Sequence, residues 1–318
     1  MTAFAVALAT VAWLARSRLS TLALDHPNPR SLHHSPVPRT GGLGLHAGVL
    51  CGWLLVAPSL PITLWVGLGL VSAISIVDDI RGVPVILRFA THLCAATAVS
   101  AGLLFAEFGP GATLLAALTI AWTTNLYNFM DGSDGLAGGM TLIGFLFYGI
   151  AAWLAGSAEF AALNFTVAAA AAAFLVFNFH PARVFLGDAG SIPLGFLAAA
   201  FGLVGWLQRD WTWWFPLLVF SPFIVDASVT LVRRLLGHEK IWQAHRDHYY
   251  QRLVQLGWGH RGTAIAEYAL MLACGGLALL ALSPSPGAQA AALAAAAFGY
   301  AMVIAAVERA WRMKTGGR

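Results

Sequence analysis

Long apolar stretches alternate along the chain with short polar connections. A membrane-spanning helix needs about 20 mostly apolar residues. Stretches without any Asp, Glu, Lys or Arg that exceed this length run over 40–77, 108–130, 135–158, 160–182 and 268–307. The pattern therefore predicts a chain that crosses a membrane several times.

Proline, glycine and charged residues divide these stretches into separate helices. The pattern predicts eleven of them, at about 2–15, 42–58, 61–77, 87–106, 111–126, 137–156, 160–178, 191–207, 212–232, 263–283 and 287–307. We expect an all-α integral membrane protein with 10–11 transmembrane helices, forming a single domain over residues 1–318.

Composition agrees with this prediction. Apolar residues make up 59% of the chain and charged residues only 10%, against about 25% charged in a soluble domain. This excludes a soluble globular protein. Cys51, Cys94 and Cys274 lie far apart in apolar segments, so neither a disulfide framework nor a metal site built from cysteines is expected.

The basic residues predict an orientation. If the N-terminus is periplasmic, every Lys and Arg except Arg209 falls on the cytoplasmic side, as the positive-inside rule requires. The C-terminus is then cytoplasmic as well. The cytoplasmic loops lie at about 16–41, 78–86, 127–137, 179–190 and 233–262, and these loops contain the polar motifs.

The first of these loops is rich in proline and glycine and carries Asp25, Arg30, His33 and Arg39. Proline and glycine favour a rigid, non-helical loop, in which Arg and His side chains could bind phosphate. A positively charged anchor at the membrane surface is the alternative that the residues leave open.

Asp78 and Asp79 stand together at the inner end of the expected third helix. Adjacent carboxylates at the edge of a membrane are costly unless they are paired, hydrated or bound to a cation. They suggest a metal site, or a base for a phosphate proton. A solvated helix end is the alternative.

Asn125, Asn128, Asp131 and Asp134 recur at intervals of three where the expected fifth helix ends. On a helix this spacing places oxygen ligands along one face. A purely structural loop would not need four such polar groups at this depth, so the motif predicts a binding site.

The segment from Asn178 to Ser191 contains Phe185 and the motif Gly187-Asp188-x-Gly-Ser191, directly before an expected helix. A carboxylate among glycines beside a helix N-terminus suits a magnesium–diphosphate complex. Helix capping by Asp188 or Ser191 is the competing interpretation. Phe185 could stack on a nucleobase or simply pack.

His245, His248 and Arg252 lie in the longest inside loop, at spacings that place them on one face of a short helix. Neutralisation of a diphosphate explains them better than zinc, because no third soft ligand follows at a suitable spacing. A solvated basic face is the alternative.

Together, these segments resemble the polyprenyl-phosphate N-acetylhexosamine-1-phosphate transferase family, glycosyltransferase family 4. The family includes the phospho-MurNAc-pentapeptide transferase and the UDP-GlcNAc:undecaprenyl-phosphate GlcNAc-1-phosphate transferase. The resemblance runs from Asp25 to about Arg261. It is carried above all by Asn125-x-x-Asn128-x-x-Asp131-Gly-x-Asp134-Gly-Leu-Ala and by the Gly-Asp-x-Gly-Ser motif around Asp188.

The resemblance implies a role for each motif. It implies catalytic roles for Asp78, Asp79, His245 and His248. It implies substrate-binding roles for Arg39, Asn128, Asp131, Asp134, Asn178, Phe185 and Arg252. Asp188 would be a ligand of Mg²⁺, with Mn²⁺ as a substitute, and Asn128 a second ligand.

The chain also departs from the family pattern. The peptidoglycan enzyme has three consecutive histidines where this chain has His245-Arg-Asp-His248, and the following Tyr249-Tyr250-Gln251 lacks a further histidine found in the common-antigen and teichoic-acid branch. The first difference favours a small UDP-N-acetylhexosamine over a muramyl-pentapeptide donor.

We therefore expect a multi-pass enzyme of the bacterial inner membrane whose active site faces the cytoplasm. It would transfer N-acetylhexosamine-1-phosphate from a UDP-sugar to undecaprenyl phosphate and release UMP, initiating a cell-surface glycan such as O-antigen or cell wall. A homodimer is one expected assembly, and no nucleic-acid partner is expected. The main rival is a transporter or lipid flippase, but transporters gather polar residues near the bilayer midplane. A non-catalytic membrane scaffold is a second rival.

Overall fold

The computed structural model describes residues 1–21, 23–27, 32, 35–57, 59–240, 245–282 and 285–316. Within these residues the fold is almost entirely helical. The long helices are α1 (Thr2–Arg16), α2 (Gly41–Val56), α3 (Ile62–Arg81), α4 (Val85–Phe129), α5 (Leu136–Leu154), α6 (Ala158–Asn178), α7 (Asp188–Leu207), α9 (Ser221–Leu236), α11 (Gly259–Leu280) and α12 (Pro286–Thr315). The shorter elements are η1 (Arg18–Thr21), α8 (Phe215–Val219), α10 (Tyr249–Leu253), the π-helical η2 (Val254–Trp258), and the strands β1 (Leu24–Asp25) and β2 (Val37–Pro38), which pair antiparallel.

Among the described residues, seven helical stretches are long and apolar enough to cross a membrane: Ile62–Arg81, Val85–Phe129, Leu136–Leu154, Ala158–Asn178, Asp188–Leu207, Tyr249–Leu280 and Pro286–Thr315. α1 and α2 are apolar but shorter. This confirms the expected all-α membrane protein. The number of crossings and the side on which each end lies remain predictions.

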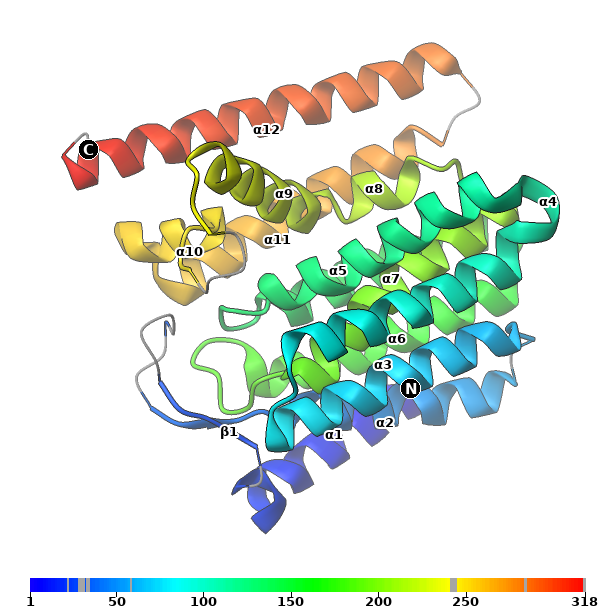
Figure 1. Cartoon of the computed structure of the whole chain (residues 1–318), viewed down its shortest axis with the longest axis horizontal. Coiled ribbons are helices and arrows are strands. Elements are labelled where there is room, and N and C mark those ends of the chain that lie inside the picture. The colour runs from blue at the N-terminus through cyan, green and yellow to red at the C-terminus, as the bar shows by residue number, and fades with distance from the viewer. Residues whose placement is uncertain are drawn as a thin grey trace.

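α4 is two helices joined at a kink. A straight helix of its 45 residues would extend about 67 Å, roughly twice the thickness of the hydrocarbon core of a bilayer. Gly109 interrupts it with φ 74° and ψ −175°. His92 Nδ1 then lies 3.3 Å from Asn125 Oδ1, so the second half runs back beside the first (Figure 1). The two halves correspond to the expected helices 87–106 and 111–126.

One expected helix is divided instead. The segment 212–232 forms α8 and α9, which meet at Phe220. Pro222 lies in the first turn of α9, where its missing N–H costs no hydrogen bond.

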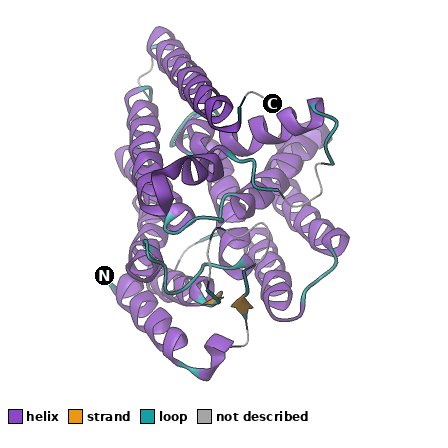
Figure 2. Ribbon diagram, turned by 90° about the vertical axis from the view of Figure 1, so that its left-hand side faces the viewer, coloured by secondary structure: helices purple, strands orange, loops and turns teal. Residues whose placement is uncertain are grey.

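The long helices pack side by side, and the loops that contain the polar motifs gather at one end with β1 and α10 (Figures 1 and 2). One buried core extends from Ala7 and Val11 in α1 to Ala292 in α12. At the loop end, a Cβ on Gly42 would lie 2.4 Å from the Cα of Gly190, so α2 and α7 touch through small residues. This contact fixes the segment before α7.

That segment is also held by hydrogen bonds. The first N–H groups of α2, from Gly41 and Gly42, donate to the carbonyls of Phe185 (3.0 Å) and Leu186 (2.9 Å). The N–H of Phe185 in turn donates to the carbonyl of Pro38, at 2.8 Å. The free N–H groups at the start of α2 therefore anchor the segment that leads into α7, whose first residue is Asp188.

Candidate active site

A cavity of about 670 Å³ lies at the end where the loops gather. Most of the residues predicted to form the site line it. They are Arg39, Asn128, Asp131, Asp134, Asn178, Phe185, Asp188, His245 and His248. Residues from four of the five loops that the sequence predicts to be cytoplasmic thus face one cavity. The loop residues Arg30 and His33 lie outside the described residues.

Asp78 and Asp188 are joined by one guanidinium. Arg88, in the first turns of α4, donates from Nη1 to Asp188 Oδ2 at 2.8 Å and to Asp78 Oδ2. Asp78 Oδ1 also accepts the N–H of Val83, at 2.6 Å. Two carboxylates 110 residues apart in sequence therefore share a cation, which partly offsets the cost of placing both at a membrane edge.

Asp79 contacts the backbone at the start of α7 rather than the cavity. Its carboxylate accepts hydrogen bonds from the N–H groups of Asp188 (3.1 Å) and Ala189 (2.8 Å), and its side chain is only 4% exposed. A carboxylate at a helix N-terminus satisfies free N–H groups and interacts favourably with the helix dipole. Asp79 thereby holds Asp188 in place.

Gly187 makes this contact possible. Its φ is +73°, and a Cβ at this position would lie 2.8 Å from Asp79 Oδ2 and 2.7 Å from the carbonyl of Arg39. Only glycine fits both the backbone conformation and the space. The first glycine of the Gly-Asp-x-Gly-Ser motif thus has a structural explanation.

Asn128 lies beside the start of α7. Its Oδ1 accepts a hydrogen bond from Ser191 Oγ at 2.8 Å, and Ser191 follows Asp188 by one helical turn. The residues proposed to bind a metal, Asp188 and Asn128, are therefore positioned by the same helix.

Carboxylates outnumber guanidiniums around this part of the cavity. Asp131, in the turn after α4, has its pKa raised well above the usual value by burial and by the charges of Asp188 and Asp79. Arg39 pairs with Asp25 and lies 3.9 Å from Asp79. The excess of negative charge favours binding of an additional cation.

Asn178 and Asp134 tie two loops together at the far side of the cavity. Asn178 accepts the N–H of Gly135 and donates to the carbonyl of Val184, both at 3.0 Å. Asp134 Oδ2 accepts from His180 Nδ1 (2.7 Å) and from the N–H of Ala182 (3.1 Å). Both side chains line the cavity, and both also shape its wall.

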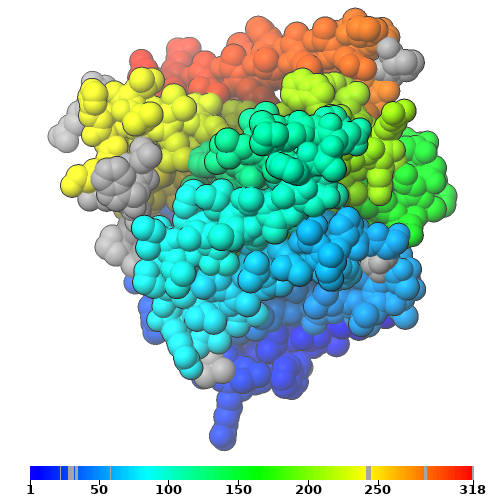
Figure 3. Space-filling view, turned by 45° about the vertical axis from the view of Figure 1, so that its right-hand side comes forward, coloured from blue at the N-terminus to red at the C-terminus, as the bar shows by residue number. Residues whose placement is uncertain are grey.

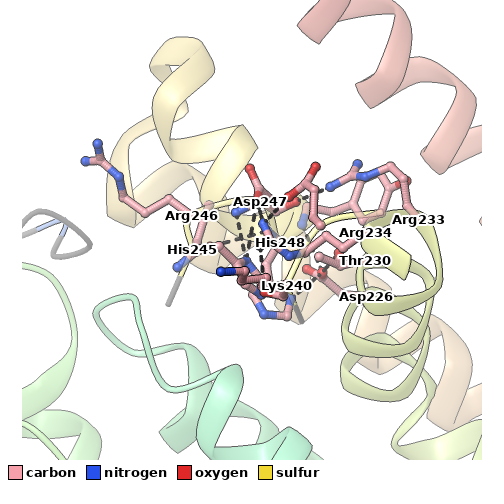
Figure 4. A network of polar contacts seen from close by, with 12 residues as sticks. Asp226, Thr230, Arg233, Arg234, Lys240, His245, Arg246, Asp247 and His248 are labelled. Carbon is pink, nitrogen blue, oxygen red and sulfur yellow. Dashed lines mark hydrogen bonds and ion pairs between the residues drawn. The ribbon is translucent and has the colours of Figure 1, made fainter. Parts of the chain in front are cut away.

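His245 and His248 face the cavity from the last inside loop, with ring centroids 4.9 Å apart (Figure 4). His248 Nδ1 lies 3.2 Å from Asp226 Oδ1, and Asp226 also accepts the N–H groups of Tyr249 and Tyr250, both at 2.9 Å. Asp226 therefore holds α10 as Asp79 holds α7.

The loop is electrostatically crowded. Burial, together with the nearby His248 and Arg234, lowers the pKa of His245 from 6.5 to about 4. Arg234 also pairs with Asp247 (Figure 4). His245 is therefore neutral at pH 7.

Arg252 is not among the residues that line the cavity. It lies on the opposite side of α10, where its Nη1 donates to Glu308 Oε1 of α12 at 2.9 Å and its guanidinium stacks over Trp311. The shared helical face predicted from spacing fails because α10 begins only at Tyr249, so His245 precedes the helix.

Sequence reasoning did not assign Arg88, Asp226 or His260 to the site. His260 Nδ1 lies 2.9 Å from Ser133 Oγ, and its ring stacks on His180. A signal did exist for two of them. Arg88 and Asp226 are isolated charges inside otherwise apolar segments, and such charges mark functional or paired sites.

The described residues contain no group of three His, Cys, Asp or Glu side chains arranged to hold a metal ion. Mg²⁺ does not require one, because it usually binds one or two carboxylates together with substrate phosphates and water. Asp188 and Asn128, in a cavity with excess negative charge, fit that smaller set of ligands. The guanidinium of Arg88 also lies beside Asp188, at 2.8 Å.

Comparisons with known proteins identify the family. Residues 61–205 match the family model of glycosyl transferase family 4. Over 290 residues the chain is 31% identical to a probable undecaprenyl-phosphate N-acetylglucosaminyl 1-phosphate transferase of Bacillus subtilis, covering 84% of this chain and 81% of that protein.

Two further relatives agree. A decaprenyl-phosphate N-acetylglucosaminephosphotransferase of Mycolicibacterium smegmatis is 28% identical over 84% of this chain and 77% of its own length. A phospho-N-acetylmuramoyl-pentapeptide-transferase of Moorella thermoacetica is 36% identical over 57% of this chain and 64% of its own length. The chain therefore belongs to glycosyl transferase family 4, the polyprenyl-phosphate N-acetylhexosamine-1-phosphate transferases.

Proposed function

We propose that the chain transfers N-acetylhexosamine-1-phosphate from a UDP-sugar to undecaprenyl phosphate, giving undecaprenyl-diphosphate-sugar and UMP. The observation that carries the proposal is that Arg88 joins Asp78 to Asp188. Arg88, Asp188 and Asn128 line a cavity formed by residues of four loops, and Asp78 lies behind this lining. The names of the relatives describe transfer of this kind to polyprenyl phosphates.

The cavity wall suits a substrate with a charged head and an apolar tail. Beside the carboxylates and arginines it is lined by Val85, Phe89, Trp122 and Phe129 of α4. Val85 is 69% exposed and Phe89 is 50% exposed, so the apolar wall continues onto the outer surface of α4. A lipid phosphate could reach Arg88 while its isoprenoid chain stays in the membrane.

In the proposed reaction, an oxygen of the lipid phosphate attacks the β-phosphorus of the UDP-sugar, and the bond to the UMP oxygen breaks. Asp78, already at the guanidinium of Arg88, would orient or deprotonate the lipid phosphate. Asp79 would keep Asp188 and the start of α7 fixed. A covalent phospho-aspartyl route is the alternative.

Mg²⁺, held by Asp188 and Asn128, would offset the charge that develops on the diphosphate. Arg88 and Arg39 would stabilise the same charge from the protein side. His245 and His248 would donate hydrogen bonds to the donor's phosphates, and Asn128, Asp131, Asp134 and Phe185 would surround the nucleotide.

We further propose in which membrane the enzyme acts and which donor it uses. The active site faces the cytoplasm of a bacterial inner membrane, and the product initiates a cell-surface glycan. A small N-acetylhexosamine is the favoured donor because His245-Arg-Asp-His248 replaces the histidine run of the pentapeptide enzymes. Against transport, the described polar residues of the site gather at one end of the bundle, whereas transporters bind near the midplane.

Exchange of radiolabelled UMP into the UDP-sugar tests the proposal on purified protein. We expect exchange that needs Mg²⁺ and undecaprenyl phosphate, because the reverse reaction must regenerate the donor. Exchange without the lipid would favour the phospho-aspartyl route. A lack of exchange with every UDP-N-acetylhexosamine, while a labelled lipid crosses the membrane of proteoliposomes, would favour transport.

A further inference from the structure

α12 is the most peripheral of the long helices. It lies along one edge of the molecule (Figure 3). Only 11% of its most apolar 18-residue stretch is buried. Phe298 and Met302 on this helix are exposed, as expected for residues that face lipid. Apolar packing alone therefore holds α12 weakly.

The cytoplasmic part of α12 is held by charge as well as by a small apolar cluster in which Val307 packs with Tyr249 and Leu253. Glu308 Oε1 accepts hydrogen bonds from Arg233 Nη1 at 2.8 Å, Arg252 Nη1 at 2.9 Å and Tyr249 Oη at 3.0 Å. The carboxylate is largely shielded, since its side chain is 23% exposed. Charge-assisted hydrogen bonds of this kind are stronger than neutral ones, and here three converge on one oxygen.

The three donors belong to the elements that present the histidines to the cavity. Arg233 lies on α9, and its second nitrogen, Nη2, donates to the carbonyl of Asp247 at 2.8 Å. Asp247 directly precedes His248. Tyr249 and Arg252 lie on α10, whose start is held by Asp226 of the same α9. Glu308 is therefore a shared acceptor that clamps α10 to α9.

Without the carboxylate of Glu308, the interaction between Arg233 and Arg252 would be repulsive. Arg233 and Arg252 both stack near the ring of Tyr249, at 5.4 and 5.7 Å from its centroid. Two guanidiniums this close repel each other unless an anion lies between them. Loss of Glu308 should push α10 away from α9 and move His248 with it.

We propose that Glu308 is a positioning residue for binding of the nucleotide-sugar, acting at a distance by fixing His245 and His248 at the cavity wall. The inference rests on the proposed function. None of the three residues that donate to Glu308 lines the cavity. Its effect on the donor must therefore pass through α9 and α10.

Glu308→Gln in the full-length protein tests this, with Glu107→Gln, an exposed glutamate in α4, as the matched control. We expect the KM for the UDP-sugar to rise roughly tenfold or more, while the KM for undecaprenyl phosphate stays within about twofold. Glu107→Gln should change neither constant. Glu308→Asp keeps the charge and should recover part of the donor affinity.

A double variant separates positioning from mere stability. If Glu308 acts through His245 and His248, adding Glu308→Gln to the double variant His245→Gln/His248→Gln should not weaken donor binding further. Losses that multiply, or an unchanged donor KM in Glu308→Gln with only a lower melting temperature, would overturn the inference and leave Glu308 as a structural latch. If Glu308→Gln does not fold, Arg233→Gln removes one of the three donors to Glu308 instead. An unchanged donor KM in Arg233→Gln overturns the inference equally. Absence of turnover by the wild-type protein would instead overturn the proposed function.

Discussion

The carboxylate of Asp79 accepts the backbone N–H of Asp188 at 3.1 Å. This hydrogen bond links the Asp78-Asp79 pair at the end of α3 to the first residue of α7. The two adjacent aspartates therefore have different partners. Asp78 contacts Arg88, and Asp79 binds the backbone that carries Asp188.

Replacing Asp79 should reveal this division. Asp79→Ala leaves two buried N–H groups without an acceptor, and we expect it to cost about 1–2 kcal/mol of stability, as the loss of a helix cap does. Asp79→Asn keeps an acceptor oxygen and should retain more of the melting temperature in detergent. An Asp79→Ala protein as stable as the wild type would contradict the capping role.

Asp78→Ala should act on chemistry rather than on donor binding. We expect UMP release to stop while the UDP-sugar still binds, because Asp78 meets the lipid phosphate and not the nucleotide in the proposed reaction. Isothermal titration with the donor and a UMP-release assay measure the two effects on the same preparation. Unchanged release rates would reject Asp78 as the base.

Asp188→Asn should abolish transfer while membrane insertion stays intact. The amide cannot supply the anionic ligand that the proposed Mg²⁺ site needs. Turnover measured over a range of magnesium concentrations checks this. Normal turnover by a properly inserted Asp188→Asn protein would remove Asp188 from the site.

Arg88 and the proposed metal would compete for Asp188, because the guanidinium occupies Asp188 Oδ2 at 2.8 Å. Arg88→Gln should therefore lower the magnesium concentration needed for half-maximal activity by roughly tenfold, equivalent to about 1.4 kcal/mol, while it slows turnover. Magnesium titrations of both proteins measure this shift. A higher magnesium requirement in the variant would contradict the competition.

His245 gives a pH dependence with a defined sign. Its pKa is lowered from 6.5 to about 4 in the folded protein, so between these values the unfolded chain binds more protons than the folded one. Stability should fall as the pH decreases from 6.5 towards 4. His245→Gln should weaken this dependence, whereas the exposed His26→Gln should not. Melting temperatures at pH 7 and pH 5 test the difference, and equal slopes in all three proteins would contradict it.

The sequence predicted the helices well because uncharged runs of membrane length leave few alternatives. α5 and α6 follow the expected 137–156 and 160–178 to within two residues. The break at Gly109-Pro110 was predicted for the same reason. The division at Phe220 was not, because Ser221-Pro222 interrupts a run whose apolar character continues on both sides.

The sequence predicted which loops form the site but not how their side chains contact one another. Asn128, Asp131 and Asp134 line one cavity, but not as one helical face, because α4 ends at Phe129. Spacing could not show that Asp79 turns to the backbone of α7 or that Arg252 turns to Glu308, since both depend on partners more than fifty residues away. Long-range pairing of charges was the information that local patterns lacked.

The most direct test of the central claim is mass spectrometry of the products made by purified protein from undecaprenyl phosphate, Mg²⁺ and a panel of UDP-N-acetylhexosamines. We predict undecaprenyl diphosphate bearing one N-acetylhexosamine, together with UMP in equal amount. Release of UDP with a lipid monophosphate-sugar, or no lipid product with any donor, would contradict sugar-phosphate transfer at this cavity.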